Sequence, residues 1–245
     1  MAANIRTETI TYTAGGTTLQ SLLAWDDGQA GPRPGIAVFG EWWGFNDYLK
    51  RRARDLAGLG YVAIAVDIYG EGREARDAGE AGELMNGLFA DMGATSERIR
   101  ASLDQLRARP EVDGQRLGAM GYCLGGALSL HAARLGLDLR GVVSFHGSLG
   151  PTHPAKPGDV KARVLVCHGA DDVLVPPDQL AGFRKEMDEL GVDLDFRSYP
   201  GAKHGFTNPE ATGKGQKYGL PLAYDEATDR QSWADMKAFW KHVYA

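Results

Sequence analysis

The chain has 245 residues, with 27 Lys and Arg against 32 Asp and Glu and a net charge of −5. This length fits one large α/β domain, residues 1–245, and a mildly acidic chain without a basic stripe argues against a nucleic-acid partner. No run approaches the roughly 18 apolar residues of a membrane span, and residues 1–13 lack the apolar centre of a secretory signal. Two cysteines, Cys123 and Cys167, do not suggest a disulfide scaffold, so we expect a cytoplasmic protein.

The N-terminal segment is typical of an antiparallel hairpin. Residues 5–13 and 18–24 are rich in Thr and β-prone, and a Gly-Gly pair lies between them.

Short apolar runs and helical periodicities then alternate along the chain. The runs, each short enough for a buried parallel strand, are residues 35–39, 61–66, 117–120, 141–145, 164–167 and 194–199. Apolar residues at spacings of three and four predict helices over residues 49–56, 99–106, 180–190 and 233–243. Asp178 is a candidate N-cap of the third helix, and Gly60 and Gly191 are placed to end helices. The alternation predicts a mostly parallel, doubly wound sheet after the hairpin.

Two stretches, residues 69–93 and 205–228, are rich in Gly and polar residues and show no clear period. Long irregular segments in a compact domain are often functional. We expect both to form walls or lids of a pocket at the carboxyl ends of the strands, where open α/β sheets bind ligands.

The strongest signal is the hexapeptide Gly-Tyr-Cys-Leu-Gly-Gly at residues 121–126, directly after the run 117–120. A nucleophile between glycines is typical of a sharp turn from a buried strand into a helix. The turn would present Cys123 at a helix N-terminus, where the dipole favours a negative charge. The alternative is a buried structural cysteine.

A nucleophilic thiol needs a base, and the base needs a group to orient it. Asp172 follows the strand-like run that ends at Cys167, and His204 follows the run that ends at Tyr199. The order Cys123, Asp172, His204 is that of strand-elbow hydrolases. The Asp-x-x-Val-Pro register favours Asp172 as the acid, with Asp171 as the alternative.

These motifs resemble the dienelactone hydrolase family of the α/β-hydrolase superfamily. The resemblance runs from Phe-Gly-Glu at residues 39–41, through the hexapeptide and Asp-Asp-Val-Leu-Val-Pro, to Tyr-Pro-Gly-Ala-Lys-His-Gly-Phe at 199–206. It implies an α/β-hydrolase fold and a Glu41 that contacts the resting thiol and controls thiolate formation. It also implies an oxyanion hole formed by the backbone N–H groups of Leu124 and Trp42.

The chain departs from this pattern at one point. The family binds a carboxylated substrate partly with an Arg shortly after the catalytic His, whereas His204 is followed by Gly-Phe-Thr-Asn. Arg73 and Arg76 are the candidate replacements, although an arginine in such a loop is more often a surface charge. The side chains of Trp42, Trp43, Tyr122 and Phe206 are candidates for an apolar acyl pocket, or for the core.

The remaining histidines, including His131, His146, His153 and His168, show no metal-ligand spacing, so we expect neither metal nor cofactor. The sequence thus favours a hydrolase, monomeric or homodimeric, that cleaves a small ester or lactone through an acyl-thioester on Cys123. Alternatives are a thioesterase, amidase or acyltransferase with the same triad, or a non-catalytic redox-sensing or binding protein.

Overall fold

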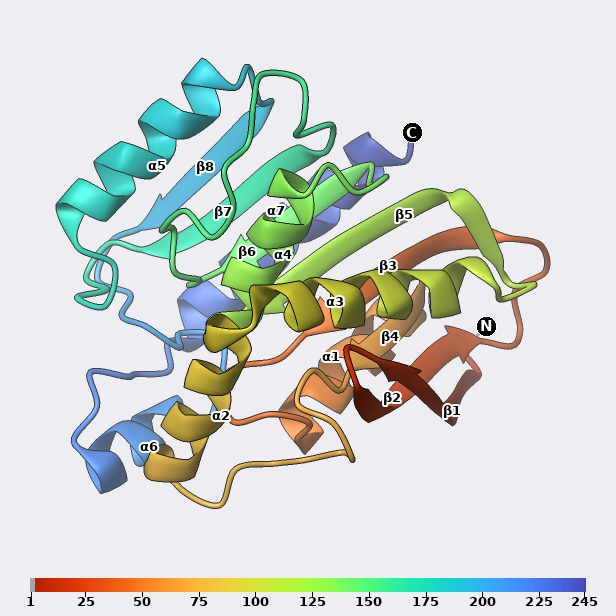
Figure 1. Cartoon of the computed structure of the whole chain (residues 1–245), viewed down its shortest axis with the longest axis horizontal. Helices are drawn as coiled ribbons and strands as arrows, with labels where there is room; N and C mark the ends of the chain where they lie inside the picture. Colours follow the sequence, from red (N-terminus) through yellow and green to blue (C-terminus); the bar gives the residue numbers. More distant parts are fainter. Residues whose placement is uncertain (1–2) are drawn as a thin grey trace. The chain divides into compact units, whose positions relative to one another are not determined.

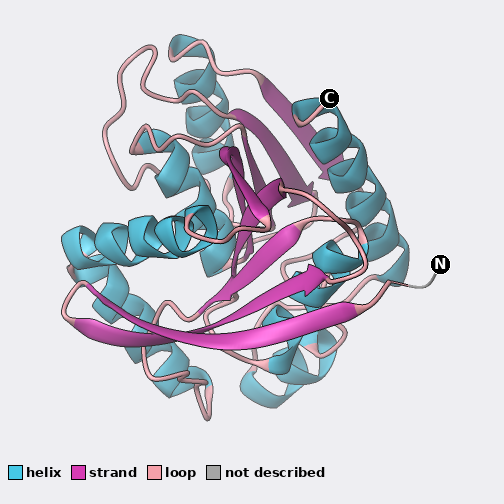
Figure 2. Ribbon diagram, turned by 90° about the vertical axis from the view of Figure 1, so that its right-hand side faces the viewer, coloured by secondary structure: helices cyan, strands magenta, loops and turns pink. Residues whose placement is uncertain are grey.

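The computed structural model describes residues 3–245, and internal contacts divide the chain into two compact units, Met1–Met120 and Gly121–Ala245. The expected single domain over residues 1–245 stays a prediction. Hydrogen bonding joins the strands into one eight-stranded sheet in the order β1-β2-β4-β3-β5-β6-β7-β8 (Figure 1). Figure 2 shows helices on both sides of the strands.

The elements have the following bounds. The first unit contains β1 (Ile5–Ala14), β2 (Thr17–Asp26), β3 (Arg33–Phe39), α1 (Asp47–Gly58), β4 (Val62–Val66), α2 (Ala78–Ala90), α3 (Met92–Arg107) and most of β5 (Val112–Tyr122). The second contains α4 (Leu124–Arg134), β6 (Gly141–Phe145), β7 (Arg163–Gly169), α5 (Pro177–Glu189), β8 (Leu194–Tyr199), α6 (Ala211–Tyr218) and α7 (Glu226–Val243).

The first unit begins with the expected hairpin. β1 and β2 pair antiparallel along their whole length, and Gly15 and Gly16 turn the chain with φ values of 53° and 69°. Two successive positive φ values are typical of the turn that matches the twist of a hairpin. β3 and β4 then pair parallel, so the predicted change from an antiparallel start to a parallel sheet is confirmed.

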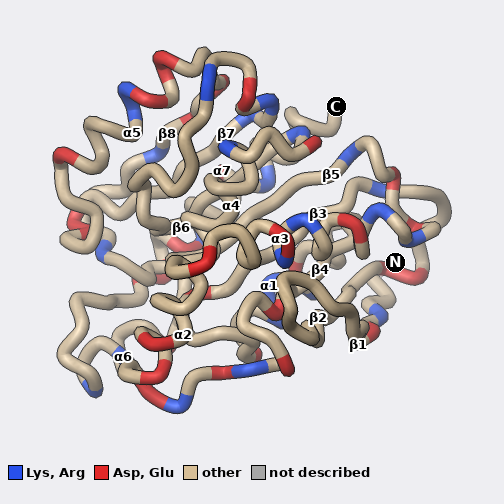
Figure 3. The backbone as a smooth tube through the Cα atoms, viewed as in Figure 1, with Lys and Arg blue, Asp and Glu red and all other residues tan. Residues whose placement is uncertain are grey.

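The second unit is built around parallel strands and a buried helix. β6 pairs with β7, and β7 with β8, both in parallel. Every residue of α4 is buried, and α4 packs against β6 while α7 packs against β6 and β7. α5, which lies at the surface of this unit, carries both acidic and basic residues (Figure 3).

Three local predictions were wrong. The stretch 69–93 contains α2 and the stretch 205–228 contains α6, so neither is wholly irregular. Only Ala81 and Leu88 of α2, and Ala211 and Gly215 of α6, are buried. α6 has few apolar residues, whereas α2 does carry them at helical spacing, at positions 81, 84, 85, 88 and 89. α5 begins after Pro176, which takes the N-cap position expected for Asp178, because a proline at the next position already has the helical φ. Gly60 and Gly191 do have positive φ, at 94° and 69°.

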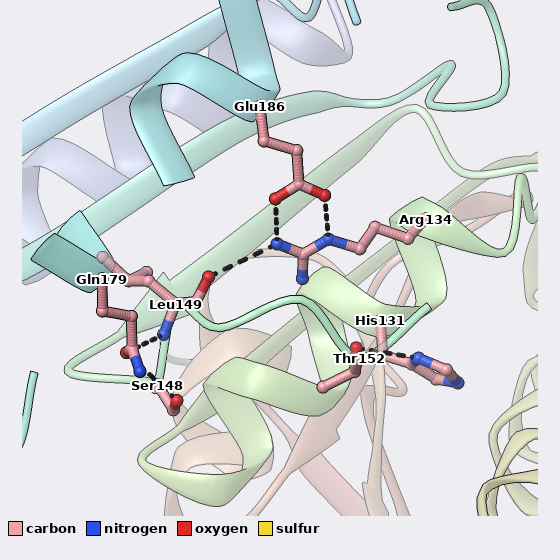
Figure 4. A network of polar contacts seen from close by, with 7 residues as sticks. All are labelled: His131, Arg134, Ser148, Leu149, Thr152, Gln179 and Glu186. Carbon is pink, nitrogen blue, oxygen red and sulfur yellow. Dashed lines mark hydrogen bonds and ion pairs between the residues drawn. The ribbon is translucent and has the colours of Figure 1, made fainter. Parts of the chain in front are cut away.

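A buried ion pair links α4 to α5 (Figure 4). The Arg134 guanidinium donates to both carboxylate oxygens of Glu186, from Nε at 2.8 Å and from Nη2 at 2.7 Å. The side chain of Arg134 is 1% exposed and that of Glu186 is 24% exposed. Two parallel charge-assisted hydrogen bonds fix both distance and orientation, so this pair sets how the far end of α4 meets α5.

We predict that Glu186→Gln lowers the free energy of unfolding by about 3 kcal/mol, because it leaves a buried guanidinium without its counter-charge. Urea denaturation monitored by circular dichroism measures the change. The matched control is Glu189→Gln on the same helix, where the pair with Lys185 spans 3.7 Å and both side chains are mostly exposed. That control is expected to cost less than about 0.5 kcal/mol. Equal effects of the two substitutions would contradict the prediction.

Candidate active site

The junction between β5 and α4 is a sharp turn at Cys123. The residue has φ 54° and ψ −115°, a conformation that L-residues rarely adopt, and its N–H donates to the Phe145 carbonyl at 3.0 Å. A Cβ on Gly121 would overlap the Gly125 carbonyl, and one on Gly126 would lie 2.6 Å from Ser144 Oγ. The glycines are therefore required by close packing around the turn, as the hexapeptide predicted.

Cys123 is partly exposed and is the residue that precedes α4. Its side chain does not cap the helix. Leu124 is the first residue of α4, where backbone N–H groups have no acceptor within the helix and the dipole favours a negative charge. The turn thus leaves the sulfur accessible beside a helix N-terminus, which favours a thiolate or an oxyanion.

The loops after β7 and β8 bring an acid and a base together. His204 Nδ1 lies 2.8 Å from Asp172 Oδ2, and both residues are about 95% buried, with exposures of 6% and 5%. The other oxygen of Asp172 accepts the N–H of Leu174 at 2.9 Å, which fixes the carboxylate. Asp171 is exposed, so of the two candidate acids it is Asp172 that contacts the imidazole.

The other ring nitrogen of His204, Nε2, is buried and makes no hydrogen bond to any residue that the structure describes. Burial by itself would lower the pKa of His204, but the Cys123 sulfur and the Asp172 carboxylate outweigh it, so the pKa stands well above its usual value. The sulfur is thus close enough to act on the imidazole. This is the electrostatic arrangement expected of a thiol and the base that takes its proton.

In the first unit, the residues after β3 are buried. Glu41 is 6% exposed and Trp43 4% exposed, so Glu41 is not an acid on a solvated loop. The Tyr69 hydroxyl donates to the Trp42 carbonyl at 2.9 Å, and the Trp42 and Trp43 rings lie 5.1 Å apart. The roles of Glu41 and Trp42 in catalysis stay predictions.

The candidate substrate-binding residues fall into two groups. Arg73 and Arg76 are exposed, and Arg76 Nε pairs with Glu80 at 2.7 Å, which is typical of a surface charge. Tyr122 and Phe206 are fully buried, with Tyr122 stacked on Phe145 at 4.9 Å. These contacts favour the packing alternative for both aromatics, and their contact with substrate stays a prediction.

His146 is a residue whose position the sequence did not reveal. Its ring packs against the His204 ring at a centroid distance of 5.2 Å. The only sequence signal is a His-Gly pair at the end of a buried apolar run, and His168-Gly169 forms the same pair at the end of β7.

Residues 3–245 include no group of three or more His, Cys, Asp or Glu side chains arranged to hold a metal ion. Within the same range, no helix combines the length and the apolar character needed to cross a bilayer.

The sequence matches the dienelactone hydrolase family over residues 19–244. The chain belongs to this family. A dienelactone hydrolase-like promiscuous phosphotriesterase from metagenomic libraries is 38% identical, with 98% of each chain covered and a TM-score of 0.92. A Yersinia pestis protein provisionally named carboxymethylenebutenolidase is 27% identical over 78% of this chain and 75% of its own length.

The fold is also that of an α/β hydrolase from a deep-sea metagenome of the Medee basin. That enzyme is 16% identical, with 99% of each chain covered and a TM-score of 0.65. The predicted family and α/β-hydrolase fold are therefore confirmed, and a hydrolase acting on an ester or lactone is what this family membership indicates.

Cys123→Ala is expected to lower the pKa of His204, because the sulfur is one of the groups that raise it. The shift is measured by NMR titration of the His204 ring in the variant and in the wild type. Cys167→Ala is the matched control, since Cys167 is buried beside Tyr199 and is not among the groups that shift His204. An unchanged pKa of His204 in Cys123→Ala would show that the sulfur does not act on the imidazole.

Proposed function

We propose that this member of the dienelactone hydrolase family cleaves a small carboxylic ester or lactone through a Cys123-His204-Asp172 triad and an acyl-thioester. The observation that carries the proposal is the buried 2.8 Å contact between His204 and Asp172, with a pKa of His204 that responds to Cys123. A structural cysteine would not require this pairing of an oriented base with an accessible sulfur.

In the first half-reaction, Nε2 of His204 takes the thiol proton and the sulfur attacks the substrate carbonyl carbon. Asp172 holds the proton on Nδ1 and stabilises the imidazolium that forms. The carbonyl oxygen becomes an oxyanion, for which the N–H of Leu124 at the start of α4 is a suitable donor. When the tetrahedral adduct collapses, the C–O bond breaks and His204 returns the proton to the leaving alkoxide.

In the second half-reaction, His204 removes a proton from water, and the hydroxide attacks the thioester carbonyl. The C–S bond breaks, the carboxylic acid leaves and the sulfur regains its proton from His204. A lactone follows the same steps, except that the leaving alkoxide stays attached to the acyl group. Thioester or amide cleavage and acyl transfer would use the same groups with another leaving group or acceptor.

We expect Cys123→Ala to lower kcat/KM for p-nitrophenyl acetate and for small lactones by at least about 10³-fold, because the nucleophile is removed. Cys167→Ala, which changes the buried thiol, is expected to retain wild-type activity. Mass spectrometry of rapidly quenched wild-type reactions should find one acyl group on the peptide that carries Cys123. Hydrolysis by Cys123→Ala at the wild-type rate would overturn the proposal.

A second candidate activity is phosphotriester hydrolysis. The relative at 38% identity and full coverage is described as a promiscuous phosphotriesterase. A thiolate that attacks a carbonyl carbon can also attack phosphorus, since both reactions need a nucleophile and donors for developing oxygen charge. Hydrolysis of paraoxon in the same assay panel tests this activity. Release of p-nitrophenol that persists in Cys123→Ala would argue against attack on phosphorus by the Cys123 thiolate.

The role of Glu41 rests on the family resemblance and its burial. A carboxylate beside a thiol disfavours the thiolate, so Glu41→Gln should increase the rate of Cys123 alkylation by iodoacetamide at neutral pH. Glu74→Gln, at an exposed glutamate, is the matched control. An unchanged or lower rate in Glu41→Gln would contradict a gating role.

A further inference from the structure

The residue that follows β6 has a strained backbone. His146 has φ 39°, in the left-handed region that favours glycine, and its N–H donates to the Cys167 carbonyl at 2.8 Å. The next residue, Gly147, lies so close to the elbow that a Cβ there would be 2.5 Å from Ser144 Oγ and 2.8 Å from the Gly126 carbonyl carbon. The chain therefore turns sharply here. A glycine would adopt this backbone more easily, but His146 places an imidazole in the interior.

The His146 ring lies between the elbow and the His204 loop. It is 1% exposed and meets the His204 ring at 5.2 Å with an interplanar angle of 64°. It also meets the Phe206 ring edge-on at 5.1 Å and 78°, and the Tyr122 ring at 6.1 Å. A hydrogen bond of 2.7 Å between His146 Nε2 and Thr207 Oγ1 fixes the orientation of the ring.

The bond to Asp172 restrains only one end of the His204 ring. A single hydrogen bond at Nδ1 leaves the imidazole able to rock about the Nδ1···Oδ2 axis, and rocking displaces Nε2, the atom that must reach the sulfur. Apart from the Cys123 sulfur, no residue that the structure describes holds Nε2 against this motion. The His146 ring packs against the His204 ring at 5.2 Å and so limits the space available to it.

We propose that His146 is a positioning residue that holds the His204 ring in the plane needed for proton transfer with Cys123. The proposal rests on the proposed function, because it assigns His146 a task only if His204 is the base. Thr207 supports the same task through its bond to His146. Loss of the ring frees the catalytic imidazole, and a displacement of the order of 1 Å costs roughly 10²-fold in rate.

The chain offers a close matched control. His131 on α4 is also 1% exposed, its Nδ1 lies 3.0 Å from Thr152 Oγ1, and its ring meets the His153 ring edge-on at 5.9 Å. Figure 4 shows this His131–Thr152 contact beside the Arg134–Glu186 pair. His131→Ala therefore removes a buried, Thr-bonded and edge-packed histidine that does not touch His204.

The experiment measures kcat and KM for p-nitrophenyl acetate in His146→Ala, His146→Phe, Thr207→Val and His131→Ala. We expect His146→Ala to lower kcat by about 10- to 100-fold with KM within about twofold of wild type. His146→Phe keeps a ring beside His204 and should recover kcat to within about fivefold of wild type. Thr207→Val should fall between the two, and His131→Ala should keep the wild-type kcat.

Equal kcat values in His146→Ala and His131→Ala would overturn the positioning role. If His146→Ala does not fold, the kcat values of His146→Phe and Thr207→Val test the proposal instead. A wild-type kcat in Thr207→Val, together with a kcat in His146→Phe that is not within about fivefold of wild type, counts against the proposal. Cys123→Ala is assayed in parallel. Full activity in that variant shows that the proposed function has failed, whereas its inactivity combined with an active His146→Ala shows that only the positioning role has failed.

Discussion

The contact between Asp172 and His204 is the interaction on which the arrangement of the two loops after β7 and β8 depends. Both groups are buried, so their bond is little screened, and it restrains the imidazole at Nδ1. The fold secures this contact through the backbone. The N–H groups of Ala170 and Asp171 donate to the carbonyls of Tyr199 and Ala202, each at 2.9 Å, and so tie the acid loop to the base loop.

The fold fixes the positions of both Cys123 and the loop that carries His204. Cys123 is held in an unfavourable conformation by glycines that allow β5 and α4 to approach closely. The His204 carbonyl accepts the N–H of Ala223 at 3.1 Å, and the Phe206 carbonyl accepts that of Asp225 at 3.1 Å, so the base loop is anchored to the segment before α7. Orientation is therefore established by folding, before any substrate binds.

The sequence predicted that Asp172 and His204 would meet and that Cys123 would lie in a sharp turn, because each follows a short apolar run and parallel strands end at one edge of a sheet. Their catalytic roles stay predictions. The contact of His146 with His204 was not predictable in this way, because it depends on a φ of 39° that no residue pattern encodes. α2 and α6 were missed for another reason. α6 has few apolar residues, whereas the helical spacing of apolar residues in α2 lies in a segment rich in Gly and Glu that obscures it.

The close packing of glycines around the turn at Cys123 limits where the sequence of such an enzyme can change. Gly121, Gly126 and Gly147 each lie against backbone atoms, so even a methyl group has no room there. By contrast, Val173 and Leu174, directly after Asp172, are 71% and 48% exposed. Laboratory evolution toward new substrates should therefore accumulate changes in this loop, while the elbow glycines stay invariant among all active clones.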